Sequence, residues 1–203
     1  FVAAVLASAF MFAAGQGLGF WLALNTRRTF GLDTAQAASV SGVALLIGGI
    51  GGPLVGGWLA DWRARRSAGG QLEVVVGAAI VAILACVLAL NSHSLAGYLA
   101  GLAILVGAGL TPLVALSALL QGIVLPPLRG SATAILGLVT QLLSAGAPYA
   151  IGALSDSLGD LRLALLLIVP ASLAVGALAA AWGLPAVKSD TAAMEQRWAA
   201  AAA

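Results

Sequence analysis

Six apolar stretches, each long enough to cross a bilayer, constrain the fold of this chain more than any other feature. A helix needs about 20 residues to cross the roughly 30 Å hydrocarbon core of a membrane. The stretches are 1–25, 37–60, 72–91, 95–124, 131–155 and 161–187. We therefore predict an all-α membrane protein in which residues 1–187 form a six-helix transmembrane bundle and residues 188–203 form a cytoplasmic tail.

The scarcity and placement of charge agree with this fold class. Charged residues make up 8% of the chain, against about a quarter in soluble domains. They gather between the apolar stretches, whereas a soluble amphipathic helix carries them along its exposed face. We expect the lipid bilayer as a partner and no nucleic acid. The single Cys86 lies inside an apolar stretch, so no metal-ligand pair and no cofactor is expected.

Basic residues divide unequally between the two sides that six crossings define. Those on the side of the termini are Arg63, Arg65, Arg66, Arg129, Lys188 and Arg197, and those opposite are Arg27, Arg28 and Arg162. The positive-inside rule then predicts that both ends are cytoplasmic, in a bacterial inner membrane. Because no basic segment precedes the first stretch, we do not expect it to be a cleavable signal peptide. Because Phe1 stands where an initiator Met is expected, we expect the chain to begin within a longer protein.

A short internal repeat gives the bundle a predicted symmetry. Residues 52–61 align without a gap with residues 147–156, and both read small-Pro-x-x-x-Gly-x-Leu-small-Asp. Each copy closes the second helix of a three-helix group, so Asp61 and Asp156 should lie on opposite sides of the membrane. Such a 3+3 inverted repeat is typical of transporters. Within it, Pro53, Pro148 and Gly152 are candidate hinge residues.

The segment between the second and third helices carries a more specific motif. Residues 57–66, Gly-Trp-Leu-Ala-Asp-Trp-Arg-Ala-Arg-Arg, resemble the GxxxDRxGR[RK] signature of the major facilitator superfamily. The matching positions are Gly57, Asp61, Arg65 and Arg66. Trp62 replaces the usual basic residue, with Arg63 one place later, and Ala64 replaces the second glycine. An Asp at a helix end opposite a basic cluster can hold a cytoplasmic gate through charge-assisted bonds; the alternative is that the basic cluster only sets topology.

Later segments, 126–132, 146–156 and 161–165, resemble the last two helices of the same superfamily, and look closest to its Spinster-like branch. The resemblance implies a twelve-helix secondary transporter of which this chain is the C-terminal half, with an N-terminal six-helix half as its partner. It also implies that the first, second, fourth and fifth helices face the central cavity and that the third and sixth face lipid. Proton-coupling acids of that branch generally lie in the other half.

No charged residue lies deep in a predicted span, so uncharged polar side chains are the candidates for contact with a small-molecule substrate. They are Gln16, Thr111, Thr140, Gln141 and Ser144. An amide in lipid needs hydrogen-bond partners, which a neighbouring helix or a bound solute supplies equally well. Uncharged candidates favour a neutral, amphipathic or lipid-like solute. Trp21 and Tyr149 are expected to anchor helices at the membrane interface.

The function that these features predict is secondary active transport of a small solute by alternating access. A non-transporting six-helix scaffold or channel subunit is the first alternative, which the inverted repeat disfavours. An intramembrane enzyme is the second. It would need a nucleophile with a base, but His93 is the only histidine and no GxSG-like serine motif is present. We therefore expect no enzymatic activity.

Overall fold

The computed structural model describes residues 2–67, 69–123 and 128–202, with side chains described from 2 to 119 and from 128 to 187 apart from residue 68. The described residues form helices and short turns without a strand. The helices are α1 (Val2–Phe30), α2 (Thr34–Ala64), α3 (Gly70–Leu90), α4 (Leu95–Ile123), α5 (Arg129–Ser144), α6 (Ala147–Leu158) and α7 (Leu161–Ala202). Six spans are long and apolar enough to cross a membrane, with α5 and α6 together forming the fifth.

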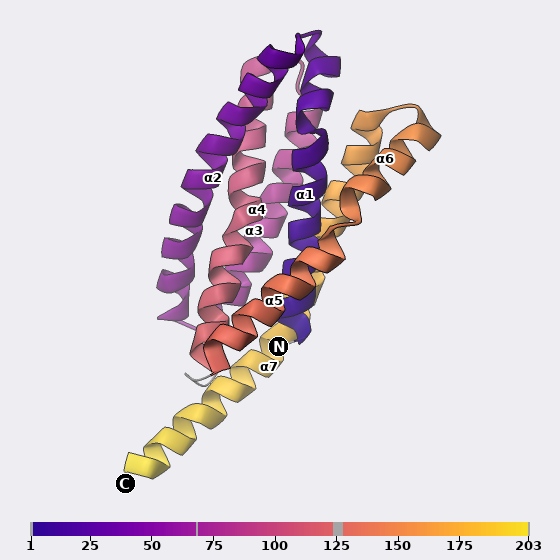
Figure 1. Ribbon diagram of the computed structural model, residues 1–203. Coiled ribbons are helices and arrows are strands. Elements are labelled where there is room, and N and C mark those ends of the chain that lie inside the picture. Colours follow the sequence, from indigo (N-terminus) through magenta and orange to yellow (C-terminus); the bar gives the residue numbers. More distant parts are fainter. Residues whose placement is uncertain (1, 68, 124–127, 203) are drawn as a thin grey trace.

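The spans run alternately up and down, so that successive connections lie at opposite ends of the bundle (Figure 1). We call the end that holds the N-terminus and the α2–α3 turn the proximal end. The other end, which holds the α1–α2, α3–α4 and α6–α7 turns, is the distal end. α7 continues past the proximal end as a helix through residue 202, beyond the expected boundary at 187.

Three turns are closed by glycines whose backbone adopts positive φ, a conformation that a side chain disfavours. They are Gly31 at φ +64°, Gly69 at φ +82° and Gly159 at φ +70°. At the distal end, Asp33 also forms a capping box with Gln36 at the start of α2. Because these turns are short, the two spans that each turn joins run antiparallel and lie next to each other.

Helix packing follows the inverted repeat. α2 packs along α4, and α5 with α6 packs along α1; likewise α3 packs on α4 as α7 packs on α1, while α3 and α7 contact each other. The first three spans therefore make the same set of contacts as the last three. In one copy, a Cβ added at Gly56 would lie 2.5 Å from Thr111 Oγ1, and in the other, a Cβ at Gly17 would lie 2.5 Å from Ile151 Cδ1. Glycine on one side lets the helices approach closely at these positions.

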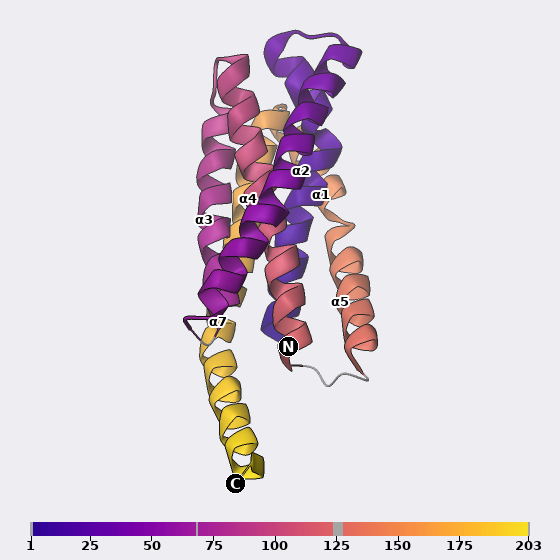
Figure 2. The ribbon, with the colours of Figure 1, turned by 90° about the vertical axis from the view of Figure 1, so that its left-hand side faces the viewer.

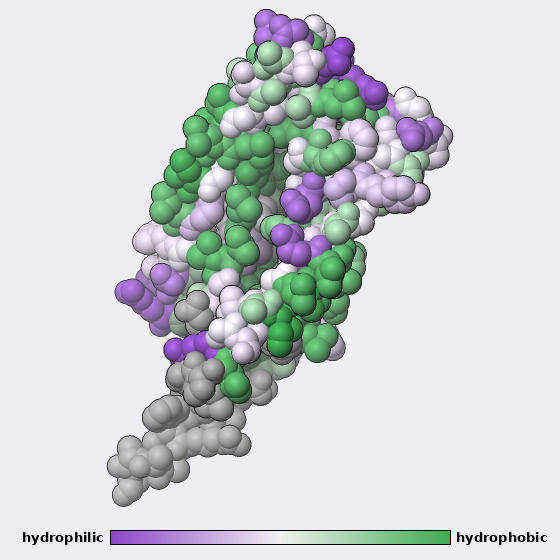
Figure 3. All heavy atoms as spheres, viewed as in Figure 1, coloured by the Kyte–Doolittle hydropathy of each residue, from purple (hydrophilic) through white to green (hydrophobic). Residues whose placement is uncertain are grey.

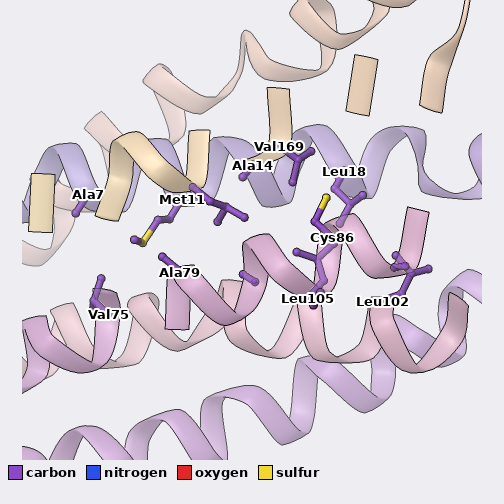
Figure 4. Close-up of a cluster of buried hydrophobic side chains, with 14 of the residues drawn as sticks. Ala7, Met11, Ala14, Leu18, Val75, Ala79, Cys86, Leu102, Leu105 and Val169 are labelled. Atoms are coloured by element: carbon purple, nitrogen blue, oxygen red, sulfur yellow. The ribbon is translucent and has the colours of Figure 1, made fainter. Parts of the chain in front are cut away.

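The core lies among α1, α3, α4 and α7 and consists of small and medium apolar side chains (Figure 4). Met11, Leu18, Cys86, Leu105 and Val169 meet there, each at most 3% exposed. The outer surface is also apolar. In the face seen in Figure 3, hydrophobic residues cover much of the surface, and hydrophilic residues gather mainly toward its ends, with a few midway. A bundle whose core and outer surface are both apolar is suited to a lipid environment.

The fifth span differs from its expected course, because it is two helices rather than one. α5 ends at Ser144, four residues before Pro148, and α6 begins at Ala147 with Pro148 in its first turn. Proline has no N–H for the carbonyl four residues earlier, and its ring clashes with that carbonyl. The break lies where Pro148 interrupts the helix. Pro53 in α2 and Pro112 in α4, however, lie inside continuous helices, so a proline alone does not predict a break.

Candidate functional site: a polar hollow on the cavity face

Two adjoining hollows lie on the face formed by α1, α4 and α5. The first, of about 160 Å³, lies between α1 and α4 and is lined by Gln16 among others. The second, of about 320 Å³, reaches α5 and is lined by Thr140 and Gln141. Both are bordered by Met11, Phe12, Gly109 and Leu110. The candidates on α1 and on α5 thus border one continuous depression.

Glycines keep this depression open. Gly15 and Gly19 on α1 line the first hollow, and Gly137 on α5 lines the second. A Cβ added at any of these three positions, or at Gly109, would meet no atom within 4 Å. These glycines are therefore not required for helix packing, unlike Gly17 on the neighbouring face of α1. Their effect is to leave space where helices α1, α4 and α5 pass each other.

The polar side chains in the hollows are uncharged. The Thr140 side-chain oxygen is buried and has no hydrogen-bond partner among the described residues. Gln141 beside it is exposed, and so is Gln16 in the first hollow. No charged residue of the described chain lines either hollow. A buried hydroxyl without a partner costs free energy unless something else satisfies it, and that makes Thr140 the strongest binding candidate.

Three further hydroxyls border the second hollow, and Ser8 is one that sequence reasoning missed. Ser117 donates to the Leu113 carbonyl at 2.6 Å and Thr133 donates to the Arg129 carbonyl at 2.9 Å. Their lone pairs can still accept a hydrogen bond. Ser8 precedes Met11, Phe12 and Gly15 by three, four and seven residues, which is the spacing of one helix face, so its position was open to prediction.

Two other predicted cavity residues lie elsewhere. Thr111 is 5% exposed, faces Gly56 of α2 rather than the hollows, and donates to the Gly107 carbonyl at 3.2 Å. Ser144 is fully buried at the end of α5 and donates to the Gln141 carbonyl at 3.1 Å. Both hydroxyls are therefore satisfied within their own helix. The structure does not bring them together with Gln16 and Thr140.

The candidate hinge around Pro148 is joined to α1 through a tryptophan. The Trp21 Nε1 donates to the Pro148 carbonyl at 2.8 Å, and a Cβ added at Gly152 would lie 2.9 Å from the Trp21 ring. Trp21 was expected at the membrane interface. It packs between α1 and α6 instead, because α6 provides both the Pro148 carbonyl as an acceptor and space for the ring beside Gly152. Tyr149 is 81% exposed, and Asp156 is exposed near the distal end of α6.

The predicted gate motif lies at the proximal end of α2. Arg63 Nε donates to Glu73 Oε2 at 2.7 Å, and Ser67 Oγ to Glu73 Oε1 at 3.3 Å. Glu73 of α3 is thus the acid that binds the basic cluster. Asp61 is exposed and forms no side-chain hydrogen bond or ion pair with the described part of the chain.

The remaining basic residues of the motif take no part in this ion pair. Arg66 stacks on Trp62, with its guanidinium carbon 4.1 Å from the ring centre, and Arg65 is exposed. Gly57 is half-buried against Val114 of α4. Gly69, with positive φ, closes the turn between α2 and α3, and a Cβ added at Gly70 would lie 2.5 Å from the Arg63 carbonyl oxygen.

A buried polar network at the distal end was not predicted. The Tyr98 hydroxyl is 2.9 Å from Thr26 Oγ1 and accepts from Asn25 Nδ2 at 3.1 Å. Thr26 Oγ1 also lies 3.1 Å from Ser41 Oγ. All four side chains are at most 4% exposed, and they join α1, α2 and α4. Their polarity was visible in the sequence, but nothing in it placed Tyr98 opposite α1.

The sequence matches no protein-family model and no curated protein, but solved structures match the fold. The POT family transporter PepTSo superposes with a TM-score of 0.72 at 16% identity, over 89% of this chain and 36% of that one. A bacterial homologue of the human lysosomal transporter Spinster, inward-facing and occupied, gives 0.60 at 20% identity, over 94% and 46%. This chain therefore shares its fold with part of each of these two transporters. It spans less than half the length of either neighbour.

The position of the hollows bears on the predicted division of the spans. The predicted division placed the first, second, fourth and fifth spans at the central cavity. Most residues that line the hollows lie on α1, α4 and α5, three of those four spans, but Leu45 of α2 and Val169 and Leu173 of α7 also line the first hollow. Hydrophilic spheres lie midway along this face in Figure 3, over α1 and α5. Which spans face a central cavity stays a prediction.

Proposed function

We propose that this chain is the C-terminal half-bundle of a secondary transporter that carries a small solute across a membrane by alternating access. The observation that carries the proposal is the depression on α1, α4 and α5, which contains a buried, unpartnered Thr140 hydroxyl and two exposed glutamine side chains. Structural likeness to two transporters supports it. Its partner is a second six-helix half, which would close the depression from the other side.

The lining of the depression favours an uncharged or amphipathic solute. Apolar side chains such as Met11, Phe12 and Leu110 form most of the wall. Thr140, Gln141 and Gln16 supply donors and acceptors that do not require a charged ligand. A few polar groups in an apolar wall orient a ligand without holding it tightly, which suits a carrier that must release its solute.

Asp61 is proposed as the gating acid. It is exposed at the proximal end of α2 and is not used by the Arg63–Glu73 ion pair. It therefore remains available for a charge-assisted bond to the other half, one that forms in one state and breaks in the other. The proximal end, with Arg63, Arg65 and Arg66, is proposed to be cytoplasmic.

A thiol-accessibility experiment tests alternating access. Gln141→Cys in a Cys86→Ala background of the full-length protein would be exposed, in sealed vesicles, to a membrane-impermeant maleimide from either side. Because the depression opens to each side in turn, we expect labelling from both sides. Leu178→Cys, which is 70% exposed on α7, is the control and should stay unlabelled in lipid. Labelling of Gln141→Cys from neither side would overturn the cavity assignment.

The gating role has its own readout in the same vesicles. Asp61→Ala should raise the labelling rate of Gln141→Cys from the proximal side, because one bond that closes this side is lost. Asp156→Ala is the matched control, since Asp156 holds the equivalent repeat position at the distal end. It should leave proximal labelling unchanged. Equal effects of the two alanine substitutions would contradict a gate at Asp61.

A further inference from the structure

A groove separate from the polar hollows lies between α2 and α3. The two helices meet at the short proximal turn and diverge away from it, with α4 visible between them (Figure 2). The groove encloses about 800 Å³, and α4 forms its floor. Along α2 it runs from Arg63 to Ile47, which is about 24 Å at 1.5 Å per residue. It therefore extends from the end of the helix past the middle of the bilayer.

The groove is apolar along its length and charged only at the proximal end. Its walls include Ile47, Val55 and Val81, each 47% or more exposed, and glycines such as Gly51 and Gly77. The charged groups that border it are the Arg63–Glu73 ion pair beside the α2–α3 turn. The occupant must therefore be apolar over most of its length, with a polar group at one end.

The groove narrows toward the proximal turn, where α2 and α3 meet (Figure 2). A helix with its side chains is about 10 Å across. A flexible hydrocarbon chain needs far less width. An empty groove of this size would leave its lining atoms without dispersion contacts, so lipid chains at the protein surface are the natural occupants.

The segment that follows Arg63 carries side chains of the kind that recognise anionic headgroups. Arg65 and Arg66 are exposed, and neither forms an ion pair with a residue in the described part of the chain. Trp58 is 67% exposed and Trp62 is 38% exposed in the last two turns of α2, just before these arginines. Tryptophan beside arginine at a helix end is typical of the headgroup level of a bilayer. Each arginine near that surface strengthens attraction to anionic lipid by about fivefold.

We propose that the α2–α3 groove binds one anionic phospholipid, one of whose two acyl chains lies between the two helices while its phosphate is held at Arg65 and Arg66. The Arg63–Glu73 pair stays intact beneath the headgroup, because it closes the turn that brings α2 and α3 together. The bound lipid fills the open part of the groove, where α2 and α3 diverge. This site is independent of the transported solute.

Native mass spectrometry of the full-length protein in detergent tests the proposal. The protein would be titrated with phosphatidylglycerol and with phosphatidylcholine of the same acyl chains. We expect phosphatidylglycerol to be retained preferentially. Gly77→Leu should abolish retention of both lipids, because a side chain there fills the groove and meets no atom of the protein within 4 Å at its Cβ. The double variant Arg65→Gln with Arg66→Gln should lose only the preference, by about fivefold per arginine.

Gly49→Leu is the matched control, since Gly49 also has open space at its Cβ but does not line the groove. It should retain lipid as the unmodified protein does, and thermal unfolding would verify that each variant is folded. Retention by Gly77→Leu equal to that of Gly49→Leu would overturn the site. Equal retention of the two phospholipids by the unmodified protein would overturn the headgroup assignment. A cross-link from Gly77→Cys to another segment of the protein would show that protein covers the groove instead.

Discussion

Tyr98 shows how a single side chain can connect three membrane helices. Its hydroxyl contacts Thr26 and Asn25 of α1, and Thr26 continues the network to Ser41 of α2. Phe30 packs edge-on against its ring, with centroids 5.1 Å apart. In lipid, burial of apolar surface does little to drive helix association, so such hydrogen bonds and close contacts hold the helices together. The network therefore fixes the distal ends of α1, α2 and α4 relative to one another.

Replacing Tyr98 by Phe tests this role. The ring and its contact with Phe30 remain, but Asn25 Nδ2 loses its acceptor and Thr26 loses one of its partners. We expect the free energy of unfolding in detergent micelles to fall by about 1 kcal/mol, the usual size of a hydrogen bond between membrane helices. Tyr149→Phe is the control, because Tyr149 is 81% exposed and should change nothing. Equal stability of the two variants would contradict the role.

Individual site residues could be predicted from the sequence only where their polarity is unusual for an apolar helix. Gln16 and Gln141 stand out because amides are rare in apolar helices, and the structure places both on one depression. Thr111 has similar polarity, yet it faces Gly56 because α2 approaches α4 closely there. The partner of Arg63 was also not predictable. Glu73 reaches it only because Gly69 and Gly70 close the turn tightly.

At the scale of elements, the broken fifth span is the main departure from a simple six-helix reading. Pro53 and Pro148 hold matched positions in the repeat, yet α2 is continuous and α5 is separated from α6. The two prolines also differ in their neighbours. Trp21 of α1 donates to the Pro148 carbonyl and packs against Gly152. A proline weakens a helix at a predictable place, but its neighbours decide whether the helix separates there.

Substitution of Pro148 by Ala separates these two causes. Alanine restores an N–H for the Ser144 carbonyl and removes a penalty of about 3 kcal/mol for a continuous helix. With spin labels at Ile135 and Leu158, both exposed, we expect the distance between the labelled backbone positions to increase toward the 35 Å or so of an unbroken helix. Pulsed electron paramagnetic resonance would measure it. An unchanged distance would assign the break to Trp21 rather than to the proline ring.

The corresponding change in the other repeat is the control for this experiment. Pro53 already lies inside a continuous α2, so Pro53→Ala should leave the distance between labels at Val43 and Trp58 as it is. Trp21→Phe, which removes the bond to the Pro148 carbonyl but keeps an aromatic ring, should leave the break in place if the proline is its cause.

At the scale of the whole molecule, the fold was predictable because its determinants are long-range and redundant. Six apolar spans define the class, and the match of 52–61 with 147–156 defines the symmetry. The packing repeats this symmetry, since α2 lies on α4 as α5 and α6 lie on α1. The depth of the hollows and of the α2–α3 groove was not predictable, because it depends on how glycines on different helices face one another.

The inversion of the repeat makes a final prediction about the molecule in its membrane. Asp61 ends its repeat copy at the proximal end and Asp156 ends its copy near the distal end, and both are exposed. In a Cys86→Ala background, Asp61→Cys and Asp156→Cys should therefore react with an impermeant maleimide from opposite faces of sealed vesicles. Reaction of both from one face would mean that an odd number of crossings does not separate them. In that case the two halves of the bundle could not be inverted copies, and the symmetry on which alternating access depends would be lost.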